Sequence, residues 1–163
     1  MSYVVVNGDL LQQRVDAIVN PWNRNIIPWW LLIPHGVSGA IKRRAGYGPF
    51  RELARRGPIP LGHAVLTSAG RLPFKGIIHV AGIDMLWRAT RDSISSSVLS
   101  AIETADRAGY ASLAMPLIGA GVGGFGPAGT LEIIEAAINQ RPTNLAITVV
   151  LFDPSAPRSV AGA

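Results

Sequence analysis

The stretch PLIGAGVGGFGP, residues 116–127, joins an apolar run to a loop with five glycines and ends on a proline. Glycine lets the backbone bend freely and leaves its N–H groups able to approach an anion. Pro127 suits the first turn of a helix, where its missing N–H is not needed. The stretch therefore predicts a strand, a phosphate-binding loop and a helix. Glycine loops also serve as simple turns, and this one lacks the lysine-serine ending of a nucleotide-triphosphate loop.

Apolar runs and helical patterns alternate on both sides of this stretch. The strand-like runs span residues 3–6, 17–20, 63–68, 76–81, 112–117 and 145–152. The helical stretches span residues 37–45, 49–56, 92–108 and 127–139. Several runs are unbroken, which is typical of strands covered on both faces. The order predicts an α/β fold with three layers, α/β/α, around a mixed, mostly parallel sheet of about six strands, whose ligands bind beyond the carboxyl ends of the strands.

Length and composition narrow the class of protein. The 163 residues suit one domain, predicted over residues 1–155, with a short tail over residues 156–163. No cysteine is present, so disulfides and thiolate chemistry are excluded, and with three histidines we expect neither a metal site nor a cofactor. The apolar run 26–33 is far shorter than the roughly 20 residues of a membrane span. Because the N-terminus has no signal-peptide pattern either, we expect a cytoplasmic protein with no membrane partner.

The charge balance favours an anionic partner. Fifteen Lys and Arg residues face ten Asp and Glu residues, which gives a formal net charge of +5. Nucleic acid, lipid and a phosphorylated small molecule are all compatible with that charge. We expect the basic clusters at residues 42–44 and 51–56 to be solvated helix faces rather than a nucleic-acid patch. His79 lies inside an apolar run, so we expect it to be a buried core histidine.

Five motifs, in order along the chain, carry a resemblance to one family. They are Gly8-Asp9-Leu10, residues 16–20 with Asn23, residues 36–41, residues 72–79 and residues 116–125. Together they cover nearly the whole chain, and the sequence resembles a macrodomain. The resemblance implies the macrodomain fold and binding of ADP-ribose, free or attached to a macromolecule. In some members it extends to hydrolysis of the ADP-ribosyl linkage, with a protein or a nucleic acid as the modified substrate. The oligomeric state stays open.

The resemblance also implies a set of ligand-binding residues. Asp9 would meet the adenine amine, Phe152 would pack on the base, glycine-loop N–H groups would hold the diphosphate, and the asparagines would lie near the distal ribose. The full set is Asp9, Leu10, Asn20, Asn23, Gly36, Val37, Ser38, Gly119, Ala120, Gly121, Val122, Gly123, Gly124, Phe125 and Phe152. From the residues alone, Asp9 equally suits a helix N-cap, Phe152 a core position and the asparagines a turn around Pro21.

The catalytic positions depart from the family. Ser38 stands where many hydrolytic macrodomains have an aspartate, and a hydroxyl cannot activate water as a carboxylate does near neutral pH. Lys42 falls where another branch has a catalytic lysine, but Gly123 replaces the acid that pairs with it. The candidates for catalysis are therefore Asn23 to orient a ribose hydroxyl or a water, His35 as a base, and Lys42 through a Schiff base, with the substrate's own phosphate as the alternative base. An ADP-ribosyl hydrolase, a non-catalytic reader and a nucleic-acid-binding protein all stay open.

The segment 24–34 is longer and more apolar than its counterpart in the family. It contains Trp29, Trp30, Leu31 and Leu32, and the prolines at positions 28 and 34 prevent one continuous helix. Burying each large apolar side chain is worth roughly 1.5–3 kcal/mol, so the segment must pack on something. We expect a flap over the reactive end of the ligand, with packing into the core or a dimer contact as the alternatives.

Overall fold

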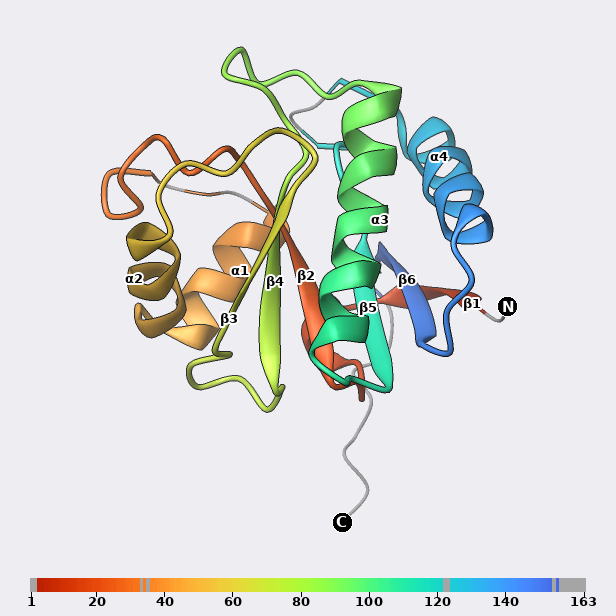
Figure 1. Ribbon diagram of the computed structural model, residues 1–163, viewed down its shortest axis with the longest axis horizontal. Coiled ribbons are helices and arrows are strands. Elements are labelled where there is room, and N and C mark those ends of the chain that lie inside the picture. The colour runs from red at the N-terminus through yellow and green to blue at the C-terminus, as the bar shows by residue number, and fades with distance from the viewer. Residues whose placement is uncertain (1–2, 33, 35, 122–123, 154, 156–163) are drawn as a thin grey trace.

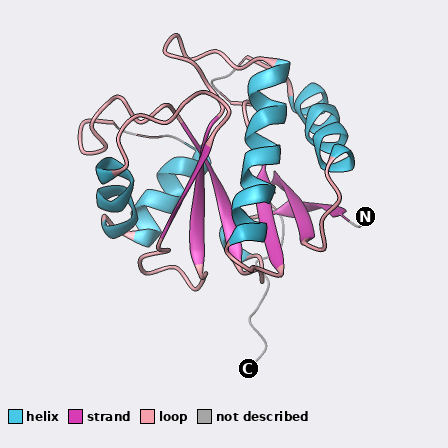
Figure 2. Cartoon of the chain, in the orientation of Figure 1, coloured by secondary structure: helices cyan, strands magenta, loops and turns pink. Residues whose placement is uncertain are grey.

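The computed structural model describes residues 3–32, 34, 36–121, 124–153 and 155. Its centre is a six-stranded sheet with the strand order β1-β6-β5-β2-β4-β3 (Figures 1 and 2). The strands are β1 (Tyr3–Gly8), β2 (Ala17–Trp22), β3 (Ala64–Thr67), β4 (Gly76–Ala81), β5 (Ser112–Pro116) and β6 (Ala146–Phe152). All neighbours pair in parallel except β3, which is antiparallel to β4. The predicted mixed, mostly parallel sheet is confirmed.

Helices cover both faces of this sheet. They are the 3₁₀ helix η1 (Leu10–Gln12), α1 (Gly36–Ala45), α2 (Gly48–Arg55), α3 (Arg91–Arg107) and α4 (Pro127–Gln140). In Figure 1, α1 and α2 form one group beside the sheet, and α3 and α4 form another. The predicted α/β/α layering is therefore confirmed, and η1 is the one helix that the sequence patterns did not predict.

The sheet separates two hydrophobic cores, and the central strand β2 contributes side chains to both. Ala17 and Val19 belong to the core under α3 and α4, whereas Ile18 and Trp22 belong to the core under α1 and α2. This alternation follows from the two-residue period of a strand, which points successive side chains to opposite faces. By the same period, Asn20 points toward α1 rather than into solvent.

Each of the four α-helices begins and ends within one residue of a helical stretch that the sequence predicts. The predicted tail, residues 156–163, lies outside the described residues. In the described ranges, no helix combines the length and the apolar character needed to cross a membrane.

Candidate functional site

The carboxyl ends of β2, β4 and β5 lie at the same edge of the sheet because these strands run in parallel. The loops that follow them gather at the upper edge in Figure 1. These loops are residues 23–32 after β2, residues 82–90 after β4 and residues 117–126 after β5. Two of the five sequence motifs, residues 16–20 with Asn23 and residues 116–125, contribute to these loops, which lie where ligands of open parallel sheets bind.

A row of buried polar side chains runs beneath this edge. The Ser38 hydroxyl donates to Asn20 Oδ1 at 2.6 Å, and Asn20 Nδ2 lies 3.0 Å from His79 Nδ1. His79 Nε2 lies 2.8 Å from the Thr67 hydroxyl, which also donates to the carbonyl of Ser68 at 2.9 Å. The row therefore connects α1, β2, β4 and β3. Such a fully paired network holds its members in one arrangement.

Burial fixes the charge and the tautomer of His79. The side chain has no exposed surface, and burial lowers its pKa to about 3, so the ring is neutral near pH 7. Because Asn20 donates to Nδ1, the ring proton sits on Nε2 and is donated to Thr67. The expectation of a buried core histidine is confirmed. The edge of its ring also packs on Phe50, with the centroids 5.7 Å apart.

The network places two predicted ligand residues below the surface. Asn20 is fully buried and Ser38 is 8% exposed, and the Ser38 hydroxyl also lies 2.9 Å from the carbonyl of Pro21. Asn20 therefore supports the site from beneath, with both atoms of its amide paired inside the protein. Ser38 can meet a ligand through its backbone N–H, because it lies with Gly36 and Val37 in the first turn of α1, where N–H groups have no partner within the helix.

Glycine at position 39 is required by the path of the chain into α1. A Cβ there would lie only 2.5 Å from the carbonyl oxygen of Pro34. The close approach holds the end of the apolar segment against the first turn of the helix.

Asn23 lies in the turn after β2 and is partly exposed. Its Oδ1 accepts a hydrogen bond from the backbone N–H of Asn25 at 2.7 Å, so the turn chemistry expected of an asparagine is present. Its Nδ2 has no hydrogen-bond partner among the residues the structure describes. Asn25 in turn donates to the carbonyls of Leu53 and Gly57, both at 2.9 Å, which ties the turn to α2. Asn23 thus combines a fixed backbone with an available amide donor.

The apolar segment is divided between the core and the surface. Trp29 and Leu32 pack against the α1–α2 core, and the rings of Trp29 and Tyr47 lie 5.2 Å apart. Trp30 and Leu31 are 69% and 63% exposed. The alternative of packing into the core is correct for the first pair, and the second pair is left on the surface.

Lys42 fastens this segment to α1. Its Nζ donates to the carbonyls of Trp29 and Leu32, at 2.6 and 3.0 Å, and lies 5.4 Å from the centre of the Trp29 ring. Burial lowers the pKa of the Lys42 amine. These contacts support a structural role for Lys42, which the sequence analysis named as a candidate catalytic nucleophile. The third catalytic candidate, His35, lies outside the described residues.

At the other end of the site, Asp9 and Phe152 flank the paired ends of β1 and β6. Asp9 Oδ1 accepts from the backbone N–H of Leu11 at 2.8 Å and caps η1, so the N-cap interpretation is correct. Asp9 Oδ2 has no partner among the described residues. Leu10 is buried, whereas Phe152 is 69% exposed, so its ring is available to a ligand and the core alternative is wrong.

The glycine loop after β5 leads directly into α4. Gly119 and Gly124 both have φ 86°, a left-handed conformation that glycine adopts without strain. Gly121 has open space where a Cβ would stand, and Gly126 caps α4 without any side-chain hydrogen bond. The free N–H groups at this helix start can therefore meet an anion. Ala120 and Phe125 are partly exposed in the same loop, while Val122 and Gly123 lie outside the described residues.

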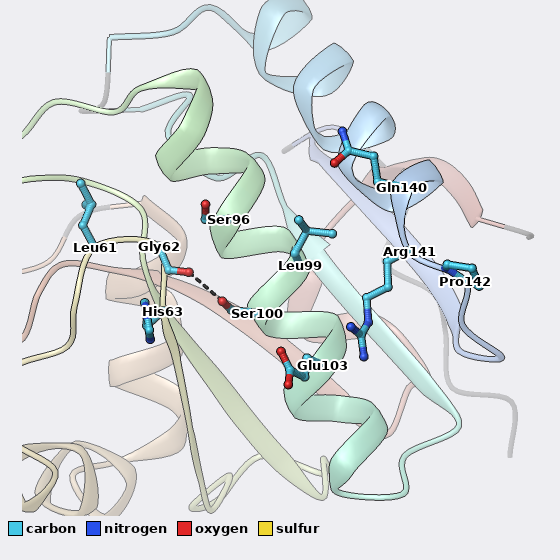
Figure 3. A pocket seen from close by; sticks show the side chains of 10 residues that line it. All are labelled: Leu61, Gly62, His63, Ser96, Leu99, Ser100, Glu103, Gln140, Arg141 and Pro142. Carbon is cyan, nitrogen blue, oxygen red and sulfur yellow. Dashed lines mark hydrogen bonds between the residues drawn. The ribbon is translucent and has the colours of Figure 1, made fainter.

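Hollows open on the surface both at this edge and away from it. A small space of about 60 Å³ lies between the loops after β2 and β4, lined by Asn23, Arg24, Ile26, Ile27, Asp84, Met85 and Trp87. The sequence patterns missed Met85 and Trp87, although an apolar group directly after a buried strand is a signal for this edge. A wider hollow of about 660 Å³ lies along α3 and the end of α4 (Figure 3). None of the predicted site residues lines the wider one.

Within the described ranges, no cluster of three or more His, Cys, Asp or Glu side chains could hold a metal ion.

Comparisons with known proteins agree on one family. The Macro domain family model matches residues 19–134. A protein of Aquifex aeolicus is 37% identical, with 76% of this chain and 73% of the relative covered. The O-acetyl-ADP-ribose deacetylase of Citrobacter rodentium is 35% identical, with 94% and 90% covered. A solved mutant of the Oceanobacillus iheyensis macrodomain with ADPR has a TM-score of 0.79 at 25% identity, with 92% of this chain and 84% of that chain covered.

The family model includes the glycine-containing motifs at residues 36–41 and 116–125. The α/β/α layering is shared with a solved macrodomain. On the fold, the ordered motifs and the relatives together, the chain belongs to the macrodomain family.

Proposed function

We propose that this protein binds ADP-ribose across the carboxyl ends of its strands. Adenine lies at Asp9 and Phe152, the diphosphate lies over the loop after β5, and the distal ribose lies at Asn23. The observation that carries the proposal is the start of α4, which follows directly from the glycine loop and whose N-cap, Gly126, provides no side-chain hydrogen bond. A helix start with free N–H groups favours a diphosphate through hydrogen bonds and through the helix dipole.

The residues at the two ends of the site suit the two ends of this ligand. Asp9 Oδ2 can accept from the adenine amine while Oδ1 caps η1. The exposed ring of Phe152 can pack on the flat face of the base. Asn23 Nδ2 can donate to a ribose hydroxyl.

The binding proposal is tested by calorimetry with ADP-ribose. Gly121→Glu places a carboxylate in the open space above the glycine loop, where it repels the diphosphate, and we expect binding to be lost. Asp9→Ala should weaken binding of ADP-ribose more than binding of inosine diphosphate ribose, which has no adenine amine. Glu132→Gln, on the exposed side of α4, is the control that changes charge away from the site. Absence of wild-type binding at millimolar ADP-ribose would refute the proposal.

A second candidate function is hydrolysis of an acyl ester on the distal ribose. It is supported by the deacetylase of Citrobacter rodentium and by the available Nδ2 of Asn23. In such a reaction water adds to the acyl carbonyl carbon, the ester C–O bond breaks, and a carboxylic acid and ADP-ribose leave. Asn23 would orient the ribose or donate to the developing oxyanion. A protein that binds without releasing acid would be a reader of ADP-ribose.

The two candidates are separated by measuring ADP-ribose and acid released from O-acetyl-ADP-ribose. Turnover that falls at least tenfold in Asn23→Ala, while ADP-ribose affinity changes much less, would support catalysis. Tight binding without release from ester-linked, protein-linked or nucleic-acid-linked ADP-ribose would establish the reader.

A further inference from the structure

The basic residues of this chain are gathered in one part of the fold. Residues 24–75, which contain α1 and α2, hold nine of the fifteen Lys and Arg residues and one of the ten Asp and Glu residues. The rest of the chain holds six basic residues and nine acidic ones. The net charge of +5 is therefore the sum of a strongly positive α1–α2 region and a slightly negative remainder, and a polyanion would be drawn to that region.

Six arginines of this region, here called the arginine face, are exposed and form no ion pair with a carboxylate among the residues the structure describes. They are Arg43 and Arg44 on α1, Arg51 and Arg55 on α2, Arg56 at the end of α2, and Arg71 in the loop before β4. Elsewhere the pattern differs, because Arg88, Arg107 and Arg141 each lie within 4.0 Å of an aspartate or glutamate oxygen. The arginine face thus keeps its guanidinium groups available.

The fold brings Arg71 from the loop before β4 to the turn between α1 and α2. Its backbone N–H donates to the carbonyl of Ala45 at 3.0 Å, and its guanidinium Nε lies 3.2 Å from the point where a Cβ of Gly46 would stand. Arg44 lies in the last turn of α1 and Arg51 lies early in α2, on either side of the same turn. Arginines from three separate segments therefore surround one turn, which neither helix alone would predict.

The arginines of α2 are not neutralised by their own helix. Arg51 and Arg55 stand four residues apart, a spacing at which like charges are neighbours on one helix face and weaken the helix slightly. Glu52, the one acid of the region, has both carboxylate oxygens occupied by Ser68, from its backbone N–H at 3.0 Å and from its hydroxyl. Because the stability of the fold does not explain these charges, a partner outside the chain accounts for them better.

An exposed aromatic ring stands within the arginine face. Tyr47 directly precedes α2, its carbonyl accepts from the backbone N–H of Arg51 at 3.0 Å, and its side chain is 57% exposed. The ring leans on Trp29, which holds it in place. The bases of a single strand can stack on such a ring, whereas a duplex keeps its bases covered and a lipid headgroup has none. The combination favours a single strand over a duplex or an anionic membrane.

We propose that the arginine face binds single-stranded nucleic acid, with phosphates on the guanidinium groups and a base on the Tyr47 ring. Guanidinium groups suit this task because they donate in pairs to phosphate oxygens. Contacts of these two kinds read no base sequence, so we expect binding without sequence preference. The inference goes beyond ADP-ribose binding and does not depend on it, since none of these residues belongs to the predicted ligand set.

The test is fluorescence anisotropy with a labelled oligouridylate of about 12 nucleotides. Uridine is chosen because it forms no stable secondary structure and lacks adenine, the base that the proposed ADP-ribose site would take. The logarithm of the binding constant should fall linearly with the logarithm of the salt concentration, with a slope of up to about −4 if all six arginines contact phosphate. Saturating ADP-ribose should leave the affinity unchanged. Displacement of the oligonucleotide by ADP-ribose would place it in the ligand site and overturn the proposal.

Two double variants separate the arginine face from net charge. Arg51→Gln combined with Arg55→Gln should reduce the size of the salt slope by about 1.4, the value for two lost phosphate contacts, while ADP-ribose affinity stays unchanged. Arg91→Gln combined with Arg107→Gln removes the same charge from α3, which belongs to the other group of helices, and should leave the slope intact. Equal losses in the two double variants would mean attraction by net charge alone and would refute the arginine face as a site.

Tyr47 provides a second matched pair. Tyr47→Leu keeps an apolar contact with Trp29 but has no flat aromatic face, so binding of the oligonucleotide should weaken at least about fivefold. Tyr47→Phe keeps the ring and should bind as wild type does. A duplex of the same length should bind more weakly than the single strand, and vesicles of phosphatidylserine and phosphatidylcholine should not sediment the protein at the salt concentration where the oligonucleotide is half bound. Tighter binding of the duplex, or sedimentation with the vesicles, would overturn the proposal.

Discussion

Asn20 and His79, on the adjacent strands β2 and β4, are joined by a 3.0 Å hydrogen bond between two side chains that have no exposed surface. The two residues stand opposite one another in the parallel register. The pair is the middle of the polar row that supports the first turn of α1, so its stability bears directly on the shape of the ligand site.

Acid should destabilise the protein through His79. The folded pKa of about 3 lies well below the usual value of 6.5, so the unfolded chain takes up a proton between these values and the folded chain does not. Stability is therefore complete above pH 6.5 and falls as the pH drops. Between pH 7 and pH 4.5 the loss from this residue is about 2–3 kcal/mol. Urea unfolding at both pH values measures this loss. His79→Gln cannot titrate, so its free energy of unfolding should fall by about 2–3 kcal/mol less than that of wild type between the two pH values. If the free energy of unfolding depended on pH equally in wild type and in His79→Gln, the low pKa of His79 would be contradicted.

Removal of the Ser38 hydroxyl, at the α1 end of the same polar row, should lower the free energy of unfolding. Ser38→Ala leaves the buried Oδ1 of Asn20 without its 2.6 Å donor, which costs about 1–3 kcal/mol in the free energy of unfolding. Chemical denaturation measures this cost. Ser95→Ala, at a partly exposed position of α3, is the control and should stay within about 0.5 kcal/mol of wild type. A neutral result for Ser38→Ala would mean that a water replaces the hydroxyl.

Lys42 should behave as an anchor of the apolar segment. Lys42→Met keeps the length of the side chain but loses both hydrogen bonds to the carbonyls of Trp29 and Leu32, and we expect a loss of about 1.5–3 kcal/mol. Limited proteolysis should cut the segment faster in this variant. Arg44→Ala, at an exposed position on the same helix, should match wild type. Reductive trapping of ADP-ribose on Lys42 by borohydride would support the Schiff-base alternative instead.

The two neighbouring tryptophans should separate stability from binding. Trp29 packs on Tyr47 and beside Lys42, so Trp29→Ala should lower the melting temperature by several degrees. Trp30 is mostly exposed, so Trp30→Ala should leave the melting temperature unchanged. If the exposed half of the segment closes over the ligand, ADP-ribose should change the tryptophan fluorescence of wild type, and the change should be smaller in Trp30→Ala. A signal identical in both proteins would place Trp30 away from the ligand.

The strands and helices could be predicted because their patterns are local. Unbroken apolar runs and one-sided helices appear in the sequence itself, and the structure places elements at all those positions. The inward direction of Asn20 was also available from the two-residue period of β2, but its position at a strand end suggested a loop residue. The sequence contains a signal that Met85 and Trp87 lie at this edge, but it cannot place them opposite Ile26 and Ile27, because that depends on the meeting of two loops that are far apart along the chain. The division of the apolar segment likewise depends on contacts with α1 and with Tyr47, which the segment's own sequence does not contain.

The polar row from α1 to β3 has a direction, and the residue at position 38 sets it. A hydroxyl there gives its proton to Asn20, so every later bond points toward Thr67. An acceptor-only side chain, as in Ser38→Asp, would turn the Asn20 amide over, move the ring proton of His79 from Nε2 to Nδ1, and make Thr67 the donor to the ring. The row would reverse its polarity, the Thr67 hydroxyl would give up its hydrogen bond to the Ser68 carbonyl, and the ¹⁵N chemical shifts of His79 would report the reversal. The side chain at position 38 of α1 would thereby decide which ring nitrogen carries the proton on a histidine of β4.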